Sequence, residues 1–271
     1  MVEIIASIVV FKTKACIINQ TIASLLKSEY VIRLFIFDNS PTDKLRNEIT
    51  EDNRITYLFN NENIGFGRAH NICIKKALHQ CKYYIVLNPD VYFDGAIIKK
   101  MVELFDSDSE IGLVAPRILY PNGKLQLSCR SLPTPFDIAI RRIPFLRHFF
   151  PKRHKFHQFL HTSYDTTLNV PFLLGCFMMI RTNVLKEVGG FDERFFLYME
   201  DLDLCRRINK KYKTLYFPEV NINHLYQRAS AKQGYLFIIH LSSMIKYFTK
   251  WGWFKDQERK RINSELLRQP S

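Results

Sequence analysis

Three carboxylates stand within four positions of one another in the second half of the chain, at Glu200, Asp201 and Asp203. Carboxylates at that density repel one another, so such a cluster is typical of sites that bind a cation, move a proton or supply a base. The apolar run VPFLLGCFMMI at residues 170–180 lies upstream, and its burial would exclude water and raise the carboxylate pKa values. The structural alternative is an acidic first turn of a helix, which the helix dipole favours.

Two further carboxylates directly follow predicted strands. Asp38 begins the turn DNSP at residues 38–41, and Asp90 ends the turn NPD at residues 88–90. In a parallel sheet the carboxyl ends of the strands share one edge, where ligands bind, so we expect both carboxylates at that edge. Asn88 and Asp90 offer oxygen ligands that suit Mg²⁺ or Mn²⁺ bridging substrate phosphates. The alternative is an ordinary proline turn with an aspartate cap.

Two weaker signals concern phosphate and metal binding. Gly65 and Gly67 lack the third glycine and the early position of a dinucleotide fingerprint, which argues against a Rossmann cofactor site. Together with Arg68 they form either a helix entry that binds phosphate or a tight turn with an exposed arginine. His224 follows a strand and is either a metal ligand or a structural histidine, of which the second is the more common.

The elements that must position these residues follow from hydrophobic patterning. Strands are predicted at residues 4–11, 33–37, 55–59, 83–87 and 215–217. Helices are predicted at residues 16–27, after the loop that starts at 60, at 97–105, from the acidic cluster to about 211, and at 233–253. This alternation predicts an α/β fold with a mostly parallel central sheet and helices on both faces. Prolines between residues 116 and 135 make the pattern less regular.

Composition bounds the class of protein. The 271 residues are 47% apolar, which is enough for a buried core, and no apolar run reaches the length of a membrane-spanning helix. The first residues are typical of a buried strand and not of a signal peptide. Six cysteines without a C-x-x-C pair suit reduced thiols in a cytoplasmic protein better than disulfides or a zinc site.

The net charge of +13 calls for an anionic partner. Residues 138–164, called the basic–aromatic segment below, contain six Lys or Arg and five Phe but no Asp or Glu. This composition suits an anionic membrane surface, and it is also compatible with single-stranded nucleic acid or with a solvated face over the core. We expect no nucleic-acid partner, because the acidic cluster and the strand-end carboxylates would repel one.

Several motifs occur together and in a fixed order. They are VFKT (10–13), FDNS (37–40), Asn63-x-Gly65 with Asn71, LNPD (87–90), GCFMMIR (175–181), GGFDERFFLYMEDLDLCRR (189–207), and His224 with Ser230. Over roughly residues 3–230 the chain thereby resembles family 2 glycosyltransferases with the GT-A fold, especially the bacterial rhamnosyltransferases of surface-polysaccharide assembly. The EDLDLC stretch and the LNPD turn are the most specific parts of this resemblance.

The resemblance implies that several positions contact a nucleotide-sugar: Phe11, Thr13, Asp38, Asn63, Arg68, Asn71 and Asn88. The first three would line the pocket for the pyrimidine base, and the next three would lie near the ribose and diphosphate. Asp90 would be the metal-binding carboxylate of a D-x-D type motif. Because Asn88 replaces the first carboxylate of that motif, we expect a lower metal affinity.

The resemblance also implies the catalytic positions. Asp201 matches the base that takes the proton of the acceptor hydroxyl. Glu200, Asp203 and Gly175 would support the acceptor or the base, and His224 would help to bind the metal or the diphosphate. A single base without a second nucleophile fits direct displacement with inversion.

The implied enzyme is a metal-dependent hexosyltransferase that uses Mg²⁺ or Mn²⁺. It would transfer L-rhamnose from dTDP-L-rhamnose to a polyprenyl-diphosphate-linked saccharide in O-antigen synthesis, at the inner face of the cytoplasmic membrane. A UDP-hexose donor and a nucleotidyl-transferring enzyme are the alternatives. We expect a GT-A domain at residues 1–230, divided into a nucleotide-sugar half (1–115) and an acceptor and catalytic half (116–230). A helical extension at residues 231–271 would follow.

Overall fold

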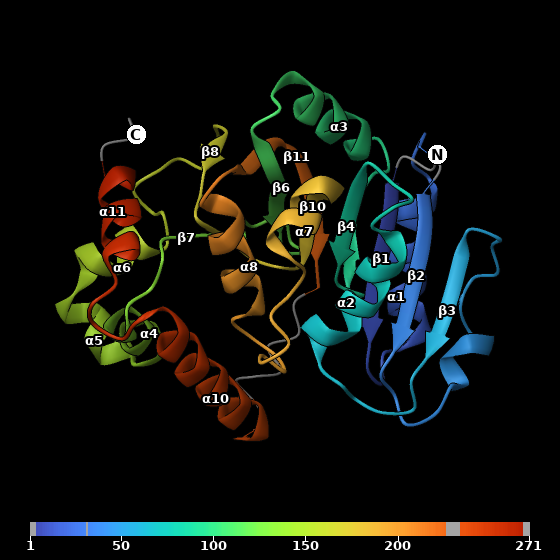
Figure 1. The fold of residues 1–271 in the computed structure, drawn as a ribbon, viewed down its shortest axis with the longest axis horizontal. Helices are drawn as coiled ribbons and strands as arrows, with labels where there is room; N and C mark the ends of the chain where they lie inside the picture. The colour runs from blue at the N-terminus through green and yellow to red at the C-terminus, as the bar shows by residue number, and fades with distance from the viewer. Residues whose placement is uncertain (1–3, 31, 226–233, 268–271) are drawn as a thin grey trace.

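The computed structural model describes residues 4–30, 32–225 and 234–267, and a mixed β-sheet forms its centre (Figure 1). Along the sheet the strands follow the order β3 (Ile55–Phe59), β2 (Ile32–Asp38), β1 (Ile4–Val10), β4 (Tyr83–Leu87), β10 (Phe177–Arg181), β6 (Ile111–Leu119), β11 (Lys213–His224) and β5 (Val91–Tyr92). A short strand, β8 (Leu168–Asn169), pairs with β11, and β7 (Cys129–Arg130) pairs with β9 (Phe172–Leu173) in a second small sheet. The predicted α/β class is confirmed.

Strands β3, β2, β1 and β4 are parallel, so their carboxyl ends lie on one edge of the sheet. All seven residues of β1 are buried, which requires cover on both faces. Ile4 and Ile8 join the core cluster that includes residues of α1 (Ala15–Leu26) and α3 (Ile97–Ser107). The next residues along β1, such as Ile5, join the cluster that includes α2 (Phe66–Ala77), α7 (Thr182–Val188) and α8 (Glu200–Asn209). A 3-10 turn, η1 (Lys44–Asn47), connects β2 to β3.

The second half of the sheet differs from the predicted pattern. β10 runs antiparallel to both of its neighbours, β4 and β6. The sequence did not predict β6, because Pro116 interrupts its apolar run. β11 has 12 residues where three were predicted, and its register shifts between Phe217 and Asn221. Pro218 lies within that shift, and a proline cannot donate to the strand ladder.

Most of the basic–aromatic segment forms short helices. These are α4 (Pro135–Arg142), α5 (Pro144–Phe149) and α6 (Pro151–His157), each with a proline in its first turn. α4 begins with a capping box, in which Thr134 Oγ1 accepts a hydrogen bond from the N–H of Asp137 at 3.2 Å. In Figure 1 the three helices lie at the left, away from the parallel strands.

The C-terminal helices α10 (Gly234–Trp251) and α11 (Gln257–Leu266) pack into the core of the sheet domain. Tyr247 and Phe248 of α10 belong to the same buried cluster as Met178 of β10. None of the described helices is long and apolar enough to cross a membrane. Ser230 and the predicted boundary between residues 230 and 231 lie outside the described residues.

Candidate active site

Asp201 is the second residue of α8 and lies where the chain turns sharply into that helix. Tyr198 and Met199 precede it with left-handed backbones, with φ of 68° and 70°. Strain of this kind in residues other than glycine is concentrated at functional sites. Both carboxylate oxygens of Asp201 accept backbone hydrogen bonds, Oδ1 from the N–H of Leu202 at 2.8 Å and Oδ2 from the N–H of Gly175 at 3.1 Å.

Gly175 permits this arrangement because it has no side chain. A Cβ at position 175 would lie 2.9 Å from Asp201 Cβ and 3.4 Å from its Oδ2. The first distance is shorter than real Cβ contacts, so any other residue would push Asp201 away from the N–H that holds it. This close approach is a physical basis for the supporting role predicted for Gly175.

Glu200 and Asp201 form a buried pair of carboxyl groups with different surroundings. Burial, and secondly the charge of Asp201, raises the pKa of Glu200 to about 8. Its Oε2 has no hydrogen-bond partner among the described residues. Burial also raises the pKa of Asp201, while its two backbone donors and the charge of Arg141 act in the opposite direction. The two backbone donors favour the ionised form of Asp201, and Glu200 Oε2 has no such donor in the described part of the chain, so of the two carboxyl groups Asp201 is the better placed to carry a negative charge.

Asp203 faces away from this pair and is fully buried. Its Oδ1 accepts hydrogen bonds from Lys250 Nζ at 2.6 Å and from Trp251 Nε1 at 2.8 Å, and its Oδ2 accepts one from Arg207 Nε at 2.8 Å. Lys250 and Trp251 belong to α10. These contacts fix α10 to α8, and they place Asp203 among structural partners instead of beside an acceptor.

A cavity of about 130 Å³ adjoins Glu200 and Asp201, between the start of α8, α4 and α10. It is lined by Pro133, Ile138, Arg141, His157, Phe172, Leu174, Tyr198, Met199, Glu200, Asp201, Leu202 and His240. Most of the lining side chains are apolar, and the polar ones include Arg141 and two histidines. Such a lining, with a few polar groups that converge on an apolar space, is typical of a small-molecule site.

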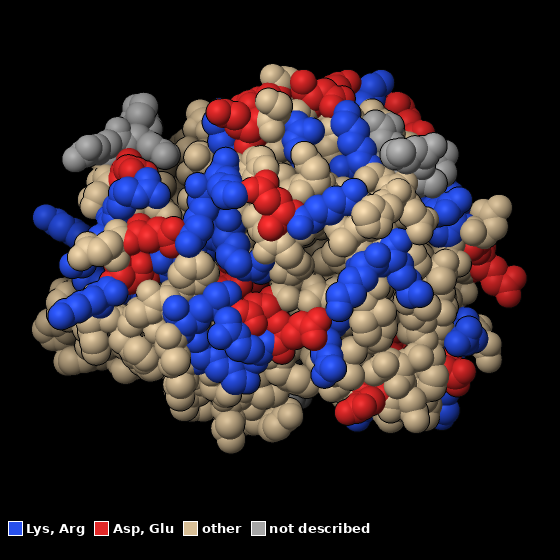
Figure 2. Space-filling view, in the orientation of Figure 1, with Lys and Arg blue, Asp and Glu red and all other residues tan. Residues whose placement is uncertain are grey.

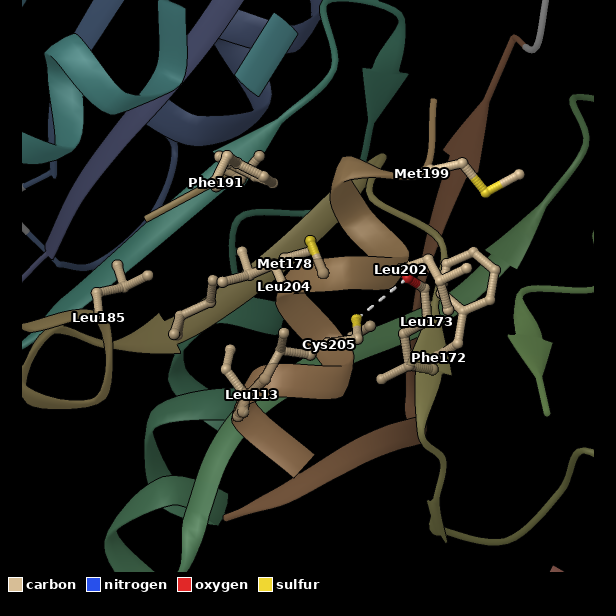
Figure 3. Close-up of a cluster of buried hydrophobic side chains, with 14 of the residues drawn as sticks. Leu113, Phe172, Leu173, Met178, Leu185, Phe191, Met199, Leu202, Leu204 and Cys205 are labelled. Atoms are coloured by element: carbon tan, nitrogen blue, oxygen red, sulfur yellow. Dashed lines mark hydrogen bonds between the residues drawn. The ribbon is translucent and has the colours of Figure 1, made fainter. Parts of the chain in front are cut away.

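The apolar side of α8 holds the helix firmly against the sheet (Figure 3). Leu204 points toward Met178 in that view, and both belong to the same buried cluster. Cys205 Sγ donates to the carbonyl of Leu173 at 3.5 Å. Asp201, the predicted base, is therefore carried by an element that the core keeps in place.

Asp90 and His224 form a second polar pair near the carboxyl end of β4. The Nε2 atom of His224 lies 3.3 Å from Asp90 Oδ1, and its Nδ1 lies 3.1 Å from Gln126 Oε1. Gln126 Oε1 can accept a hydrogen bond from the Nδ1 side of the ring, and Nε2 is the ring nitrogen that faces Asp90. An imidazole nitrogen beside a carboxylate is a pair of ligand atoms that a cation could share.

The two polar groups meet at the turn formed by Gly175 and Cys176. The carbonyl of Cys176 accepts a hydrogen bond from the N–H of Asn88 at 2.9 Å, and the N–H of Gly175 donates to Asp201. Burial and then the charges of Asp90 and Asp201 raise the pKa of the Cys176 thiol, so this thiol lies near both carboxylates. The LNPD turn and the EDLDLC stretch thus contact the same short turn.

The donor set fits a hard divalent cation that is only partly held by protein. Among the described residues, no group of three His, Cys, Asp or Glu side chains could hold a metal. One carboxylate and one imidazole leave most of the coordination shell to water and substrate oxygens. Mg²⁺ and Mn²⁺ sites that bridge diphosphates have this character.

Asp38 lies on the same edge of the sheet, at the end of β2. In the strand ladders Asp38 pairs with Val10, and Leu87 pairs with Ile8, so Asp38 and the LNPD turn are two strands apart, roughly 10 Å. Asp38 is fully buried. The N–H of Ser40 donates to its Oδ1 at 2.8 Å, and the hydroxyl of Tyr57 donates to its Oδ2. Sequence reasoning did not identify Tyr57.

Of the other residues predicted for the pyrimidine pocket, Phe11 is 47% exposed and Thr13 is half-buried. Both lie in the loop after β1, and the N–H of Lys12 between them donates to Ser40 Oγ at 2.8 Å. This hydrogen bond fixes the loop beside the DNSP turn, so Phe11, Thr13 and Asp38 are brought to one part of the edge.

The residues predicted for the ribose and diphosphate lie around the start of α2. Asn63 Oδ1 accepts from the N–H of Gly65 at 3.1 Å, and Gly65 has φ of 92°. Arg68 is exposed, with its Nε 3.6 Å from Glu193 Oε2. Asn71 is buried, donating to the carbonyl of Phe191 and accepting from its N–H, both at 2.8 Å. Asn71 therefore fixes the loop before α8, while Asn63 is half-buried and Arg68 is exposed.

Two cavity residues were not singled out by the sequence. His240 lies in α10, about 40 positions from the acidic cluster, and gave no signal. Arg141 was noted only as one of the cations of the basic–aromatic segment. The sequence could not assign Arg141 to a cavity wall, because that depends on how α4 packs in the fold.

Comparison with known proteins gives concordant matches. The family model described as glycosyl transferase family 2 matches residues 7–189. The N-acetylglucosaminyl-diphospho-decaprenol L-rhamnosyltransferase of Mycobacterium tuberculosis is 24% identical over 92% of this chain and 86% of its own length. Rhamnosyltransferase WbbL of Escherichia coli is 24% identical over 74% of this chain and 76% of its own length.

A solved structure supports the fold. The structure of GalNAc-T7 with UDP, GalNAc and Mn²⁺ superposes with a TM-score of 0.59 at 16% identity, over 83% of this chain. This chain spans 43% of the length of that one. The likeness confirms the GT-A type of fold.

Proposed function

The chain belongs to glycosyl transferase family 2, and we propose that it transfers one sugar from a nucleotide-sugar to a lipid-linked saccharide, with inversion at the anomeric carbon. One observation carries the proposal. The Gly175–Cys176 turn joins a base, Asp201, to the Asp90 and His224 pair, which has the donor set for a diphosphate-bound cation.

The geometry suits a single displacement. Asp201 takes the proton of the acceptor hydroxyl as its oxygen forms a bond to the anomeric carbon, and the bond from that carbon to the diphosphate oxygen breaks. The backbone donors of Leu202 and Gly175 orient the Asp201 carboxylate for this proton. Mg²⁺ or Mn²⁺ held by Asp90 and His224 would neutralise the charge of the departing nucleoside diphosphate. Asp38, with Phe11 and Thr13, would hold the nucleobase.

For the donor we propose dTDP-L-rhamnose. The two curated relatives described above are both named rhamnosyltransferases, and the mycobacterial name specifies a lipid-diphosphate acceptor. A UDP-hexose is the alternative donor, since the related fold of GalNAc-T7 was solved with UDP. We place the reaction in surface-polysaccharide synthesis such as that of O-antigen, at the inner face of the cytoplasmic membrane.

The surface supports peripheral attachment to such a membrane. The exposed large apolar residues of the basic–aromatic segment are Ile143, Phe145, Phe149, Phe150 and Leu160. Phe145 and Phe149 form a ring pair with centroids 4.6 Å apart. In Figure 2 the lower left of the molecule, over α5 and α10, is mostly apolar or uncharged, with Lys and Arg around it. Apolar residues framed by cations suit an anionic bilayer.

The substitution Asp201→Asn tests the proposal. We expect transfer to fall by at least about a hundredfold, the range typical of a lost general base, while nucleotide binding is unchanged. The assay compares dTDP-L-rhamnose with UDP-hexoses as donors, a prenyl-diphosphate-linked N-acetylglucosamine as acceptor, and Mn²⁺ present or chelated. Wild-type turnover in the variant would contradict the assignment of the base. Release of pyrophosphate in place of a nucleoside diphosphate would instead support a nucleotidyltransferase.

A further inference from the structure

Arg141 supplies the positive charge of the cavity beside Asp201. Burial lowers the pKa of His157 and of His240 to about 3, so both lining imidazoles are neutral at neutral pH. Among the described residues of the lining, Arg141 is then the permanent cation. Its charge lowers the pKa values of Asp201, His157 and His240, which places the guanidinium within electrostatic reach of the base and of both histidines.

The two carboxyl groups of the lining carry little negative charge. Because its pKa is raised to about 8, Glu200 keeps its proton at neutral pH and adds no charge to the lining, which leaves Asp201 as the one other carboxyl group among the described lining residues. Apart from the two neutral histidines and Tyr198, the remaining lining is apolar and includes Ile138, Phe172 and Leu174. An anionic group beside Arg141 would thus meet one carboxylate and a surface of low polarity, in which an arginine–phosphate pair is strong.

Beyond Arg141, the cavity wall continues into an exposed apolar surface. Arg142 lies with its guanidinium 5.0 Å from the ring centroid of Phe237, and this contact joins the end of α4 to α10. Figure 1 shows α4 beside α10 in the same region. Other exposed apolar residues of α10 recur every three or four positions and so share one side of the helix: Tyr235, Ile238, Leu241 and Ile245.

The face of α10 opposite this apolar stripe contributes to the cavity. His240 is buried in the lining, and its ring lies 5.1 Å from that of Tyr198, centroid to centroid. Ser243 donates to the carbonyl of Leu197 at 2.8 Å, which fixes this side of α10 next to the turn that precedes Asp201. One helix therefore has a cavity side and an apolar outer side, with Arg141 near their junction.

We propose that Arg141 binds the diphosphate of a prenyl-diphosphate-linked acceptor, whose sugar reaches Asp201 and whose prenyl chain leaves along the apolar stripe of α10. This inference rests on the proposed function and specifies its acceptor site. Each part of this acceptor has a matching partner on the protein. The sugar hydroxyl meets the base Asp201, the diphosphate meets the cation Arg141, and the prenyl chain meets the apolar stripe of α10. Arginine suits the middle position because its planar fork donates two parallel hydrogen bonds to phosphate oxygens.

The test measures binding of farnesyl diphosphate to the full chain by calorimetry, with farnesol and inorganic pyrophosphate as partial probes. We expect wild type to bind farnesyl diphosphate at least tenfold more tightly than either partial probe. Arg141→Gln should weaken that binding by about tenfold to a hundredfold, the range for a lost charge-assisted hydrogen bond, and Arg141→Lys should weaken it less. The control Arg261→Gln removes an exposed arginine of α11 that forms an ion pair with Glu265, and it should leave the affinity unchanged.

Titration with UDP and dTDP, run on the same samples, separates the two levels of the argument. If Arg141→Gln binds farnesyl diphosphate as tightly as wild type, the assignment of Arg141 is wrong. If wild type binds the nucleotides but not farnesyl diphosphate, the acceptor site is wrong and the proposed transfer stands. If wild type binds neither farnesyl diphosphate nor the nucleotides, both the acceptor site and the proposed function are wrong. With complete substrates, Arg141→Lys should raise the KM of the acceptor and leave the KM of the donor unchanged, which a merely structural role would not produce.

Discussion

At the scale of single residues, the EDLDLC stretch divides its carboxylates between two tasks. Asp201 lies at the cavity and takes two backbone hydrogen bonds, whereas Asp203 is buried against Lys250 and Trp251. Sequence reasoning located the cluster and favoured Asp201 through the family resemblance. Spacing could not separate the two roles, because the face of α8 that becomes structural is decided by its contact with α10, whose Lys250 lies 47 positions after Asp203.

Gly175→Ala should impair catalysis without removing any catalytic group. The new methyl group would collide with Asp201 Cβ and shift the carboxylate, and a misplacement of about 1 Å costs on the order of a hundredfold in rate. We expect kcat to fall by about tenfold to a hundredfold while nucleotide affinity is unchanged, measured by steady-state kinetics and by titration. Gly234→Ala is the matched control, since a Cβ there meets nothing within 4 Å. Equal rates for Gly175→Ala and wild type would show that Asp201 does not need this contact.

Glu200→Gln should change how stability depends on pH. The pKa of Glu200 is raised from 4.5 to about 8 in the folded chain, so between these values the folded state binds more protons than the unfolded state. The contribution of Glu200 to the free energy of unfolding is therefore complete below about pH 4.5 and is lost as the pH rises toward 8. Glutamine cannot ionise, so the variant does not lose this contribution. Between about pH 4.5 and 8, its free energy of unfolding should rise relative to that of wild type by about 1.4 kcal/mol per pH unit.

Urea denaturation of both proteins at several pH values measures this difference. The buried histidines have the opposite effect, because they lower the free energy of unfolding as the pH falls. This contribution is the same in both proteins, so it cancels when the two are compared at each pH. Parallel curves for Glu200→Gln and wild type would contradict the raised pKa of Glu200.

At the scale of elements, the sequence predicted the parallel half of the sheet far better than the rest. Strands 55–59 and 83–87 were predicted with their observed bounds, since each is short, apolar and closed by turn residues. β10 was not assigned, because the continuous apolar run at 170–180 has no period that would separate strand from loop or fix its direction. Prolines made the pattern look irregular, yet α4, α5 and α6 each begin with a proline. Proline is favoured at the first position of a helix, so these prolines start helices instead of interrupting them.

The far end of α8 anchors the C-terminal helices through Arg206, which is 1% exposed. Its Nη2 lies 2.7 Å from Asp256 Oδ1 and 2.9 Å from Glu258 Oε2. Arg206→Met should lower the free energy of unfolding by about 3–5 kcal/mol, because it leaves the nearly buried Asp256 without its main partner. Chemical denaturation measures the loss. Lys210→Met, at a more exposed pair with the same Glu258, should cost under about 1 kcal/mol. Equal effects of the two substitutions would contradict an anchoring role for Arg206.

At the scale of the whole molecule, the net charge of +13 and the exposed phenylalanines predict a membrane-bound enzyme without a described spanning helix. The charge could be counted from the sequence, but its distribution over the surface could not. The apolar side of α10 adjoins the basic–aromatic segment only because α10 returns to α4 in the fold. The proposed attachment surface thus draws on two distant parts of the chain.

Co-sedimentation with vesicles rich in phosphatidylglycerol tests this surface. Wild type should bind at low ionic strength and dissociate as salt is raised, since cations contribute about 1 kcal/mol each near an anionic surface. Replacing Phe145 and Phe149 together by serine should reduce partitioning by tenfold or more, because each exposed ring is 58–69% accessible and would enter the bilayer. Phe254→Ser, at an exposed ring outside the segment, is the control. Binding that survives loss of both rings would place the attachment elsewhere.

The contact between Asp203 and α10 has a consequence for protein engineering. A shortened enzyme made by deleting the C-terminal helices would expose Asp203 and the core residues that α10 covers, close to Asp201, the proposed base. Those helices cannot be treated as a detachable tether. A chimera that takes them from a relative, in order to redirect the enzyme to another lipid, must also take the partners on α8, so that the catalytic helix and the tail are exchanged as one module.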